Sequence, residues 1–155
     1  MVGQGALREC LRDPDVEHVV SVVRTPGAVR NEKLREIEHR DFLNFASIES
    51  ELIGIDACLY CLGVTSSGMS EDAYSRVAYG FTVAATRTLL RLNFKMSFVF
   101  ISGSGADTSE RGRVMWARVK GKTENALLAM PFSAVYVFRP GLIQPLDGIT
   151  SKTPS

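Results

Sequence analysis

Met96-Ser-Phe-Val-Phe-Ile-Ser102 is an almost unbroken apolar run, which is typical of a strand covered on both faces. The segment 103–107, Gly-Ser-Gly-Ala-Asp, then breaks the strand and predicts a loop. A helix is expected over residues 113–130. It carries Trp116 and Lys120 on one face, because they are four residues apart. The order of strand, loop and helix indicates one unit of a parallel α/β sheet.

The rest of the chain repeats this alternation of apolar strands and amphipathic helices. Such an order predicts an α/β fold: a Rossmann-like, doubly wound parallel sheet in three layers, with right-handed crossovers. A strand comes first in that fold and lies centrally. Here a helix comes first, which is unusual for that fold. The other expected strands cover residues 16–23, 36–39, 56–62 and 134–138, and the other expected helices cover 3–11, 45–53 and 71–92, with 32–37 a weakly amphipathic piece.

Composition excludes several classes of protein. The 155 residues are 45% hydrophobic and 23% charged, which fits one globular domain over 1–155. A net charge of +1 gives no electrostatic argument for nucleic acid or an acidic membrane surface. No apolar run approaches the roughly 20 residues that cross a bilayer. The first five residues lack the features of a signal peptide, so we expect a cytoplasmic protein.

Cysteine, histidine and tyrosine give no site of their own. Cys58 and Cys61 are spaced as C-x-x-C but lie in an expected strand, where their side chains point to opposite faces, so we expect reduced, buried cysteines. His18 and His39 belong to different elements, and no cluster has metal-ligand spacing. We therefore predict no metal site. The four tyrosines are expected to be packing residues.

Several landmarks resemble the extended and atypical short-chain dehydrogenase/reductase superfamily, especially its NAD(P)-binding, nucleoside-diphosphate-sugar epimerase-like members. The resemblance covers nearly the whole chain. In that superfamily a serine after the fifth strand precedes a Tyr-x-x-x-Lys helix, and here Ser102 precedes Trp116 and Lys120. Met1-Val-Gly-Gln-Gly5 looks like the end of the glycine-rich fingerprint, with Gly3 as its third glycine. We therefore expect the earlier glycines, the first strand and a C-terminal substrate-binding portion to lie outside this chain.

The resemblance implies a dinucleotide across the carboxyl ends of the strands, with pyrophosphate at the first helix. Arg24 ends the second strand of the family order, where a base accommodates the 2′-phosphate of NADP and an acid would favour NAD. NADP is therefore favoured over NAD, although a solvated loop arginine is the simpler interpretation of Arg24. The other residues that the resemblance assigns to the cofactor are Gly3, Asp41, Phe42, Leu62, Gly63, Lys120, Arg139 and Pro140. Gly63 is equally well explained as the end of a strand.

The resemblance assigns catalysis to Ser102, Lys120 and the position of Trp116. Trp116 cannot replace the usual tyrosine, because an indole N–H is only a hydrogen-bond donor and does not titrate usefully near the working pH. The alternative for Trp116 is packing, and the alternative for Ser102 is a small residue where the backbone bends. Ser104 is a second candidate for polarising a carbonyl, and Asp107 and Glu124 are candidate acids by proximity in the sequence alone.

Three functional hypotheses remain open at this point. The chain is an NADP-dependent oxidoreductase or epimerase-like enzyme on a small carbonyl or sugar-nucleotide-type substrate, a dinucleotide-binding sensor or interaction module without turnover, or an inactive fragment. The resemblance also allows a homodimer through the helices over 71–92 and 113–130. Exposed apolar residues on the first of these helices would be its sign.

Overall fold

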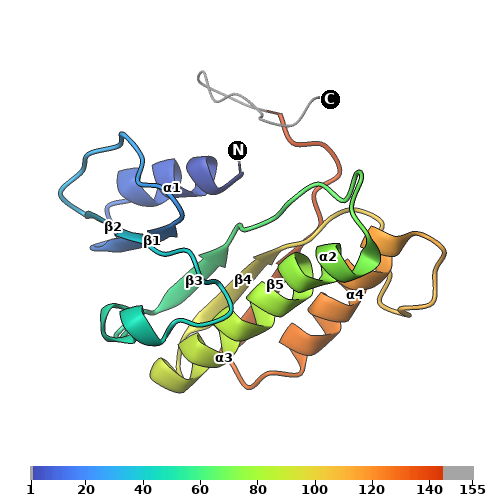
Figure 1. Ribbon diagram of the computed structural model, residues 1–155. Coiled ribbons are helices and arrows are strands. Elements are labelled where there is room, and N and C mark those ends of the chain that lie inside the picture. The colour runs from blue at the N-terminus through green and yellow to red at the C-terminus, as the bar shows by residue number, and fades with distance from the viewer. Residues whose placement is uncertain (1, 145–155) are drawn as a thin grey trace.

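The computed structural model describes residues 2–144, in which helices and strands alternate along the chain (Figure 1). The strands are β1 (Val19–Val23), β2 (Leu34–Glu38), β3 (Ala57–Tyr60), β4 (Ser97–Ile101) and β5 (Ala134–Phe138). The helices are α1 (Val2–Arg12), the 3₁₀ helix η1 (Ala46–Glu51), α2 (Glu71–Ser75), the π-helical turn η2 (Arg76–Phe81), α3 (Thr82–Leu92) and α4 (Met115–Leu128).

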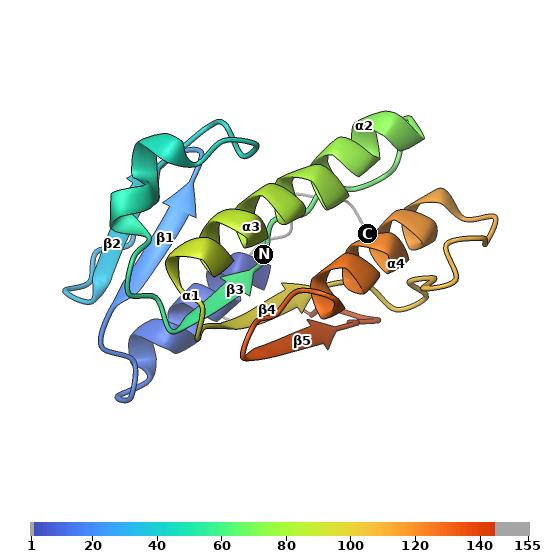
Figure 2. The ribbon, with the colours of Figure 1, turned by 90° about the horizontal axis from the view of Figure 1, so that it is seen from below.

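Every strand pair is parallel, but the strands form two sheets. β1 pairs with β2, from Val19 opposite Leu34 to Val23 opposite Glu38. The second sheet has the order β3-β4-β5. Helices α2, α3 and α4 cover one side of the β3-β4-β5 sheet, and α1 lies on the other side (Figure 2). The α/β class with flanking helices is therefore confirmed. The single continuous sheet is not observed, because β1 and β3 do not pair.

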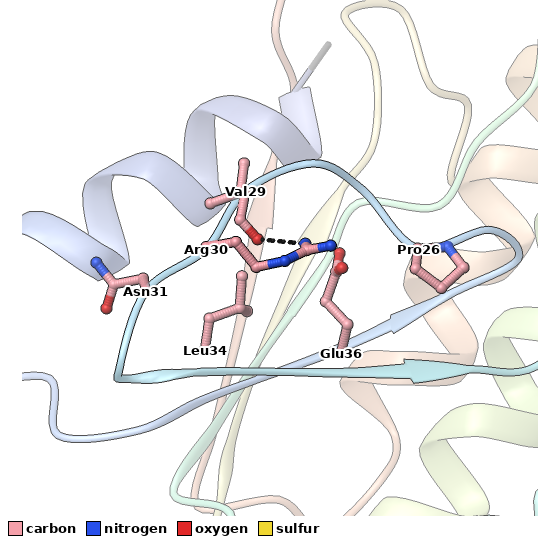
Figure 3. Close-up of a pocket in the computed structure, with 6 residues that line it drawn as sticks. All are labelled: Pro26, Val29, Arg30, Asn31, Leu34 and Glu36. Atoms are coloured by element: carbon pink, nitrogen blue, oxygen red, sulfur yellow. Dashed lines mark hydrogen bonds between the residues drawn. The ribbon is translucent and has the colours of Figure 1, made fainter.

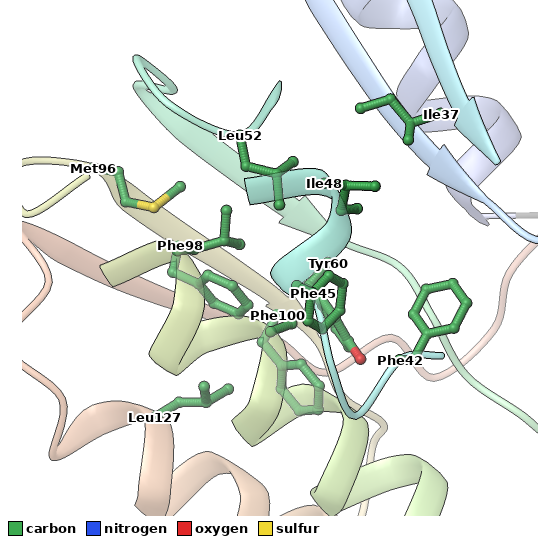
Figure 4. Packing of buried hydrophobic residues seen from close by; sticks show 12 residues of the cluster. Ile37, Phe42, Phe45, Ile48, Leu52, Tyr60, Met96, Phe98, Phe100 and Leu127 are labelled. Carbon is green, nitrogen blue, oxygen red and sulfur yellow. The ribbon is translucent and has the colours of Figure 1, made fainter. Parts of the chain in front are cut away.

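One apolar core joins the two sheets to the helices. Phe98 and Phe100 of β4 are 0% and 1% exposed, and they point the same way because alternate residues of a strand share a face (Figure 4). Ile37 of β2 and the partly buried Val20 and Val22 of β1 belong to the same cluster. The apolar run over residues 96–102 therefore lies at the centre of the fold.

The predicted helix over 71–92 is one continuous helical segment made of α2, η2 and α3. Ser70 caps its start, since its Oγ accepts a hydrogen bond from the Ala73 amide at 3.2 Å. No large apolar side chain on residues 71–92 is strongly exposed. The expected sign of a dimer interface is therefore absent from this segment, and a homodimer stays a prediction.

Two boundaries differ from the sequence-based expectation for local reasons. The strand expected from residue 16 begins at Val19. The Val16 amide donates to the carbonyl of Asp13 in a turn, and the first hydrogen bond on the β2 side runs from the Val19 amide to the carbonyl of Lys33, just before β2. The helix expected over 45–53 is only a 3₁₀ helix. Gly54, at φ 79°, follows it with a left-handed backbone that an α-helix does not adopt. β2 (Leu34–Glu38) overlaps both the weakly amphipathic piece expected over 32–37 and the strand expected over 36–39.

The packing of α4 against the loop after β4 depends on Gly121. A Cβ atom at this residue would lie 1.7 Å from the carbonyl oxygen of Asp107 and 2.7 Å from the amide of Thr108. These are backbone atoms, so the contact is not relieved by a rotamer change. The absence of a side chain at Gly121 therefore allows the helix to approach the loop.

We expect Gly121→Ala to lower the free energy of unfolding by about 3 kcal/mol, at the upper end of typical overpacking costs. Gly5→Ala is the matched control, because Gly5 is also helical and a Cβ there meets nothing within 4 Å. Alanine should stabilise that position by up to about 1 kcal/mol. Urea unfolding of both variants measures the difference. Equal effects of the two substitutions would show that the contact does not limit the fold.

Candidate functional site

The predicted site residues follow the carboxyl ends of the strands. Arg24 comes directly after β1, Leu62 and Gly63 shortly after β3, Ser102 after β4 and Arg139 after β5. Carboxyl ends of parallel strands meet at the same edge of a sheet, which is where open α/β sheets bind ligands. The fold therefore brings Ser102 and Arg139 together on adjacent strands.

A buried carboxylate connects these strand ends to α4. Glu124 is 1% exposed and accepts hydrogen bonds from the Ser102 hydroxyl and from Arg139, whose Nε lies 3.0 Å from Oε1. Arg139 also forms an ion pair with Glu124 through Nη2. A buried charge needs such partners. Since a serine hydroxyl has one hydrogen, Ser102 has none left to donate to a substrate oxygen in this arrangement.

Lys120 lies on the same face of α4, one turn before Glu124. Its Nζ donates to the carbonyl of Ile101 at 3.0 Å and lies 4.9 Å from the centre of the Phe100 ring. Burial lowers the pKa of the Lys120 amine, while the Glu124 carboxylate acts in the opposite direction. An ammonium group has three hydrogens, so Lys120 keeps donors for a further ligand.

Trp116 packs over the two glycines of the loop after β4. A Cβ at Gly103 would lie 3.5 Å from the indole, and one at Gly105 would lie 3.6 Å from it. Gly105 has a left-handed backbone, with φ 89°. The indole is partly buried and joins a small cluster with Tyr74, Ala78 and Val119. Trp116 therefore packs against this loop, and its catalytic assignment stays a prediction.

Asp107 is not a candidate acid for this edge in the observed arrangement. Its carboxylate accepts hydrogen bonds from the Ser109 hydroxyl at 2.6 Å and from the Gly112 amide at 2.6 Å, with further bonds from the amides of Ser109 and Arg111. These hydrogen bonds lower the pKa of Asp107, and the bond from the Ser109 hydroxyl has the largest effect. The carboxylate therefore organises the loop 107–112.

At the other end of the edge, α1 begins against β3. A Cβ at Gly3 would lie 3.3 Å from that of Cys61, so the helix and the strand approach closely here. Leu62 packs on the main core, whereas Gly63 is exposed and has open space beside it. No acidic residue lies in the first turn of α1. Its positive end is therefore not neutralised by its own side chains.

Arg24 is exposed and has no ion pair or side-chain hydrogen bond within residues 2–144. A neighbouring hollow of about 250 Å³ lies between the following loop and β2, lined by Val29, Arg30 and Glu36 among others (Figure 3). Arg30 already donates to the carbonyls of Gly27 and Val29, and Glu36 adds a negative charge. Arg24 is therefore the better candidate of these two arginines for a phosphate.

The remaining predicted residues lie in different surroundings. The ring of Phe42 is 7% exposed and stacks on Phe81 at 5.9 Å, so it belongs to the core and is not available to an adenine. Asp41 is exposed and caps the Leu43 amide. Pro140 accepts a hydrogen bond from the amide of Ser104 at 3.0 Å, which ties the segment after β5 to the loop after β4.

The sequence identifies Glu124 only as one of two candidate acids, whereas in the structure it forms the central contact between the strand ends and α4. The sequence does indicate that Glu124 shares a helix face with the predicted site residues, because Trp116, Lys120 and Glu124 follow one another at intervals of four residues on α4. Its partner Arg139 lies in another element, and the sequence offered no direct signal for that contact.

The cysteines and metal-binding residue types give no further site. Cys10, Cys58 and Cys61 are free, and burial raises the pKa of Cys58 to about 12. Among residues 2–144, no group of three or more His, Cys, Asp or Glu side chains is placed to hold a metal ion.

Comparison with curated proteins identifies fungal relatives. The chain is 32% identical over 149 residues to protein fmp52-1, mitochondrial, of Aspergillus terreus, and 29% identical over 150 residues to protein fmp52, mitochondrial, of Emericella nidulans. Each match covers 92% of this chain but only 62% and 63% of the relative. The chain therefore spans less than two thirds of the length of these relatives. No family model matches it.

A solved structure supports the fold. A short-chain dehydrogenase/reductase from Burkholderia vietnamiensis matches with a TM-score of 0.58 and 14% identity, over 94% of this chain and 81% of that one. At such low identity the match shows the fold alone. This chain therefore has a fold like that of the short-chain dehydrogenases/reductases, as the sequence resemblance implied.

The expected cytoplasmic location is contradicted. The fungal relatives carry the word mitochondrial in their names, including two proteins of Scheffersomyces stipitis. The expectation rested on the absence of signal-peptide features, which says nothing about import into mitochondria. Within residues 2–144, no helix has the length and apolar character needed to cross a membrane.

The role assigned to Asp107 predicts a pH dependence. A carboxyl group with a lowered pKa in the folded state adds stability above its ordinary pKa of about 4, and this is lost as the pH falls through the lowered value. We therefore expect Asp107→Asn to lower the Tm at pH 7, with the difference from wild type shrinking below about pH 4. Asp56→Asn is the control, because the Asp56 carboxylate has no hydrogen-bond partner in the described part of the chain. A constant difference at all pH values would contradict the role.

Proposed function

We propose that this chain is the dinucleotide-binding part of a short-chain-dehydrogenase-like protein and that it prefers NADP(H) to NAD(H). The observation that carries the proposal is the position of Arg24. It is an exposed arginine without an ion pair in residues 2–144, and it directly follows β1 at the carboxyl edge of a parallel sheet. A guanidinium in that position suits a 2′-phosphate.

The other residues at this edge support the same assignment. The amino end of α1 offers amide groups to a pyrophosphate, and Gly63 leaves open space beside β3. Lys120 has spare donors for ribose hydroxyls. When bound, NADP(H) supplies or accepts a hydride. The residues of this chain would hold its phosphates and riboses.

The geometry favours binding without turnover over catalysis by the usual route. Reduction of a carbonyl needs a proton donor for the oxygen as well as a hydride for the carbon. The indole N–H of Trp116 is a hydrogen-bond donor but not an acid near neutral pH, the Ser102 hydrogen goes to Glu124, and Asp107 is engaged in its own loop. A binding or sensing role is therefore the first candidate, and an oxidoreductase or epimerase-like activity is the second.

The names of the relatives bear on location. We propose that the whole protein functions in mitochondria, because the fungal proteins that the chain resembles are named as mitochondrial. Their names state no ligand, substrate or reaction, so the ligand is proposed from the site alone.

Thermal unfolding with each cofactor tests the binding proposal. A ligand at a hundred times its Kd stabilises the folded state by about 2.7 kcal/mol. We expect NADPH to raise the Tm more than NADH at the same concentration. Arg24→Gln should weaken NADPH binding about tenfold or more, because a bond to a charged group is lost. Arg87→Gln on α3, an exposed arginine away from the strand ends, is the matched control. A Tm that neither cofactor changes would refute the proposal.

Substitution of Trp116 on α4 distinguishes a binding role from a catalytic one. We expect wild type and Trp116→Phe to show no NADPH oxidation with a panel of aldehydes and ketones. Trp116→Tyr should show turnover, because a phenol supplies the missing acid and such acids contribute on the order of 10²-fold or more. Turnover by the wild-type chain at a rate similar to Trp116→Tyr would contradict a binding role. Equal rates for the Phe and Tyr variants would exclude the phenol as the missing group.

A further inference from the structure

We infer that the amine of Lys120, which the ion pair between Glu124 and Arg139 leaves without a carboxylate of its own, is a nucleophile that captures small aldehydes as an imine. The inference goes beyond the proposed function, because this reaction needs no dinucleotide. Lys120 is half-buried on α4, and its Nζ lies 3.0 Å from the carbonyl oxygen of Ile101, the last residue of β4. The amine is therefore held at the carboxyl edge of the sheet, where open α/β sheets bind ligands.

The first observation is that the neighbouring carboxylate is engaged elsewhere. Glu124 follows Lys120 by four residues on α4, a spacing at which a glutamate and a lysine can form an ion pair. Instead, its Oε1 accepts hydrogen bonds from Ser102 and from Nε of Arg139, and its Oε2 pairs with Nη2 of Arg139. Lys120 forms no ion pair within residues 2–144. Its amine therefore lacks the close counter-charge that stabilises an ammonium group.

The contacts of Nζ suit a neutral amine. In the described part of the chain, the carbonyl of Ile101 is its one hydrogen-bond acceptor. A neutral amine has two hydrogens and a lone pair, so it keeps this bond and still has the lone pair for a reaction. Nζ also lies 4.9 Å from the centre of the Phe100 ring, which is 1% exposed. Burial lowers the pKa of Lys120 and outweighs the opposite effect of Glu124, and such desolvation activates lysine amines.

The reaction is a condensation that needs neither an oxidant nor a reductant. The lone pair of the neutral amine forms a bond to the carbonyl carbon, while the π electrons of the C=O bond move to the oxygen. That oxygen then leaves as water with the two hydrogens of the nitrogen, and a C=N double bond remains. Aldehydes are favoured over ketones, because a carbonyl carbon that carries a hydrogen approaches a half-buried amine with less steric hindrance.

Lys122 provides a comparison within the same helix. Its Nζ also lies over an aromatic ring, 4.6 Å from the centre of the Tyr79 ring. The side chain of Lys122 is exposed, however, whereas that of Lys120 is half-buried. The two lysines thus share a helix and an aromatic neighbour but differ in burial and in the hydrogen bond to Ile101. We therefore expect Lys120 to be the more reactive of the two.

Reductive trapping of the unaltered chain with propanal gives the first test. Cyanoborohydride delivers a hydride to the imine, and peptide mass spectrometry locates the stable propyl-lysine that results. Without any dinucleotide present, we expect Lys120 to be labelled before Lys122 and the other lysine side chains. Lys120→Arg should lose this early label, and Lys122→Arg should keep it. Equal labelling of Lys120 and Lys122, or faster labelling of Lys122, would overturn the inference.

The second test releases the carboxylate of Glu124. Arg139→Gln removes the cation that engages it, so we expect Glu124 to pair with Lys120 and the labelling of Lys120 to slow, while Lys122 keeps its rate. Arg87→Gln, which changes an exposed arginine on α3, is the control and should leave both rates unchanged. Labelling is measured below the Tm of each variant, so that only folded chains are compared. A wild-type rate at Lys120 in Arg139→Gln would refute the role of the ion pair and with it the inference.

Discussion

The buried carboxylate of Glu124 is the contact on which the carboxyl edge of the β3-β4-β5 sheet depends. A charge that is 1% exposed needs close partners, and this one has them on two strands. Ser102 reaches it from the end of β4 and Arg139 from the end of β5, while Glu124 itself comes from α4. The contact therefore fixes two strand ends and a helix relative to one another. Replacement of Glu124 would leave the buried Ser102 hydroxyl without this acceptor, and replacement of Arg139 would remove the cation that pairs with the buried charge.

The same contact decides what chemistry the edge can perform. It occupies the only hydrogen of the Ser102 hydroxyl, so the serine is an acceptor toward anything bound there. Lys120 gives one hydrogen bond to Ile101 and keeps the others. Of these two residues, Lys120 thus keeps cationic donors, whereas Ser102 has no hydrogen left to give. Such a set can hold hydroxyl and phosphate groups, whereas transfer of a proton to a substrate requires a group with a suitable pKa.

Sequence patterns predicted the elements whose signals are local. The apolar run at residues 96–102 and the N-cap at Ser70 identified β4 and the long helix, and β5 has the predicted limits. The pairing of Glu124 with Arg139 and the clash that a side chain at Gly121 would make with Asp107 join distant segments, and no local pattern reports them. The aromatic ring of Phe42 shows the same limit, because its place in the core depends on Phe81, almost forty residues later.

The composition of a strand does not determine how completely its neighbours bury it. β1 is as apolar as β4, yet Phe98 and Phe100 of β4 are almost inaccessible while every residue of β1 is only partly buried. β4 has a strand on each side and helices above it, whereas β1 has a strand on one side alone. The hydrophobic stabilisation of a strand scales with the apolar area that its neighbours remove from water. Burial of apolar side chains is therefore most complete around β4 and decreases toward the edges of β1 and β3, which do not pair.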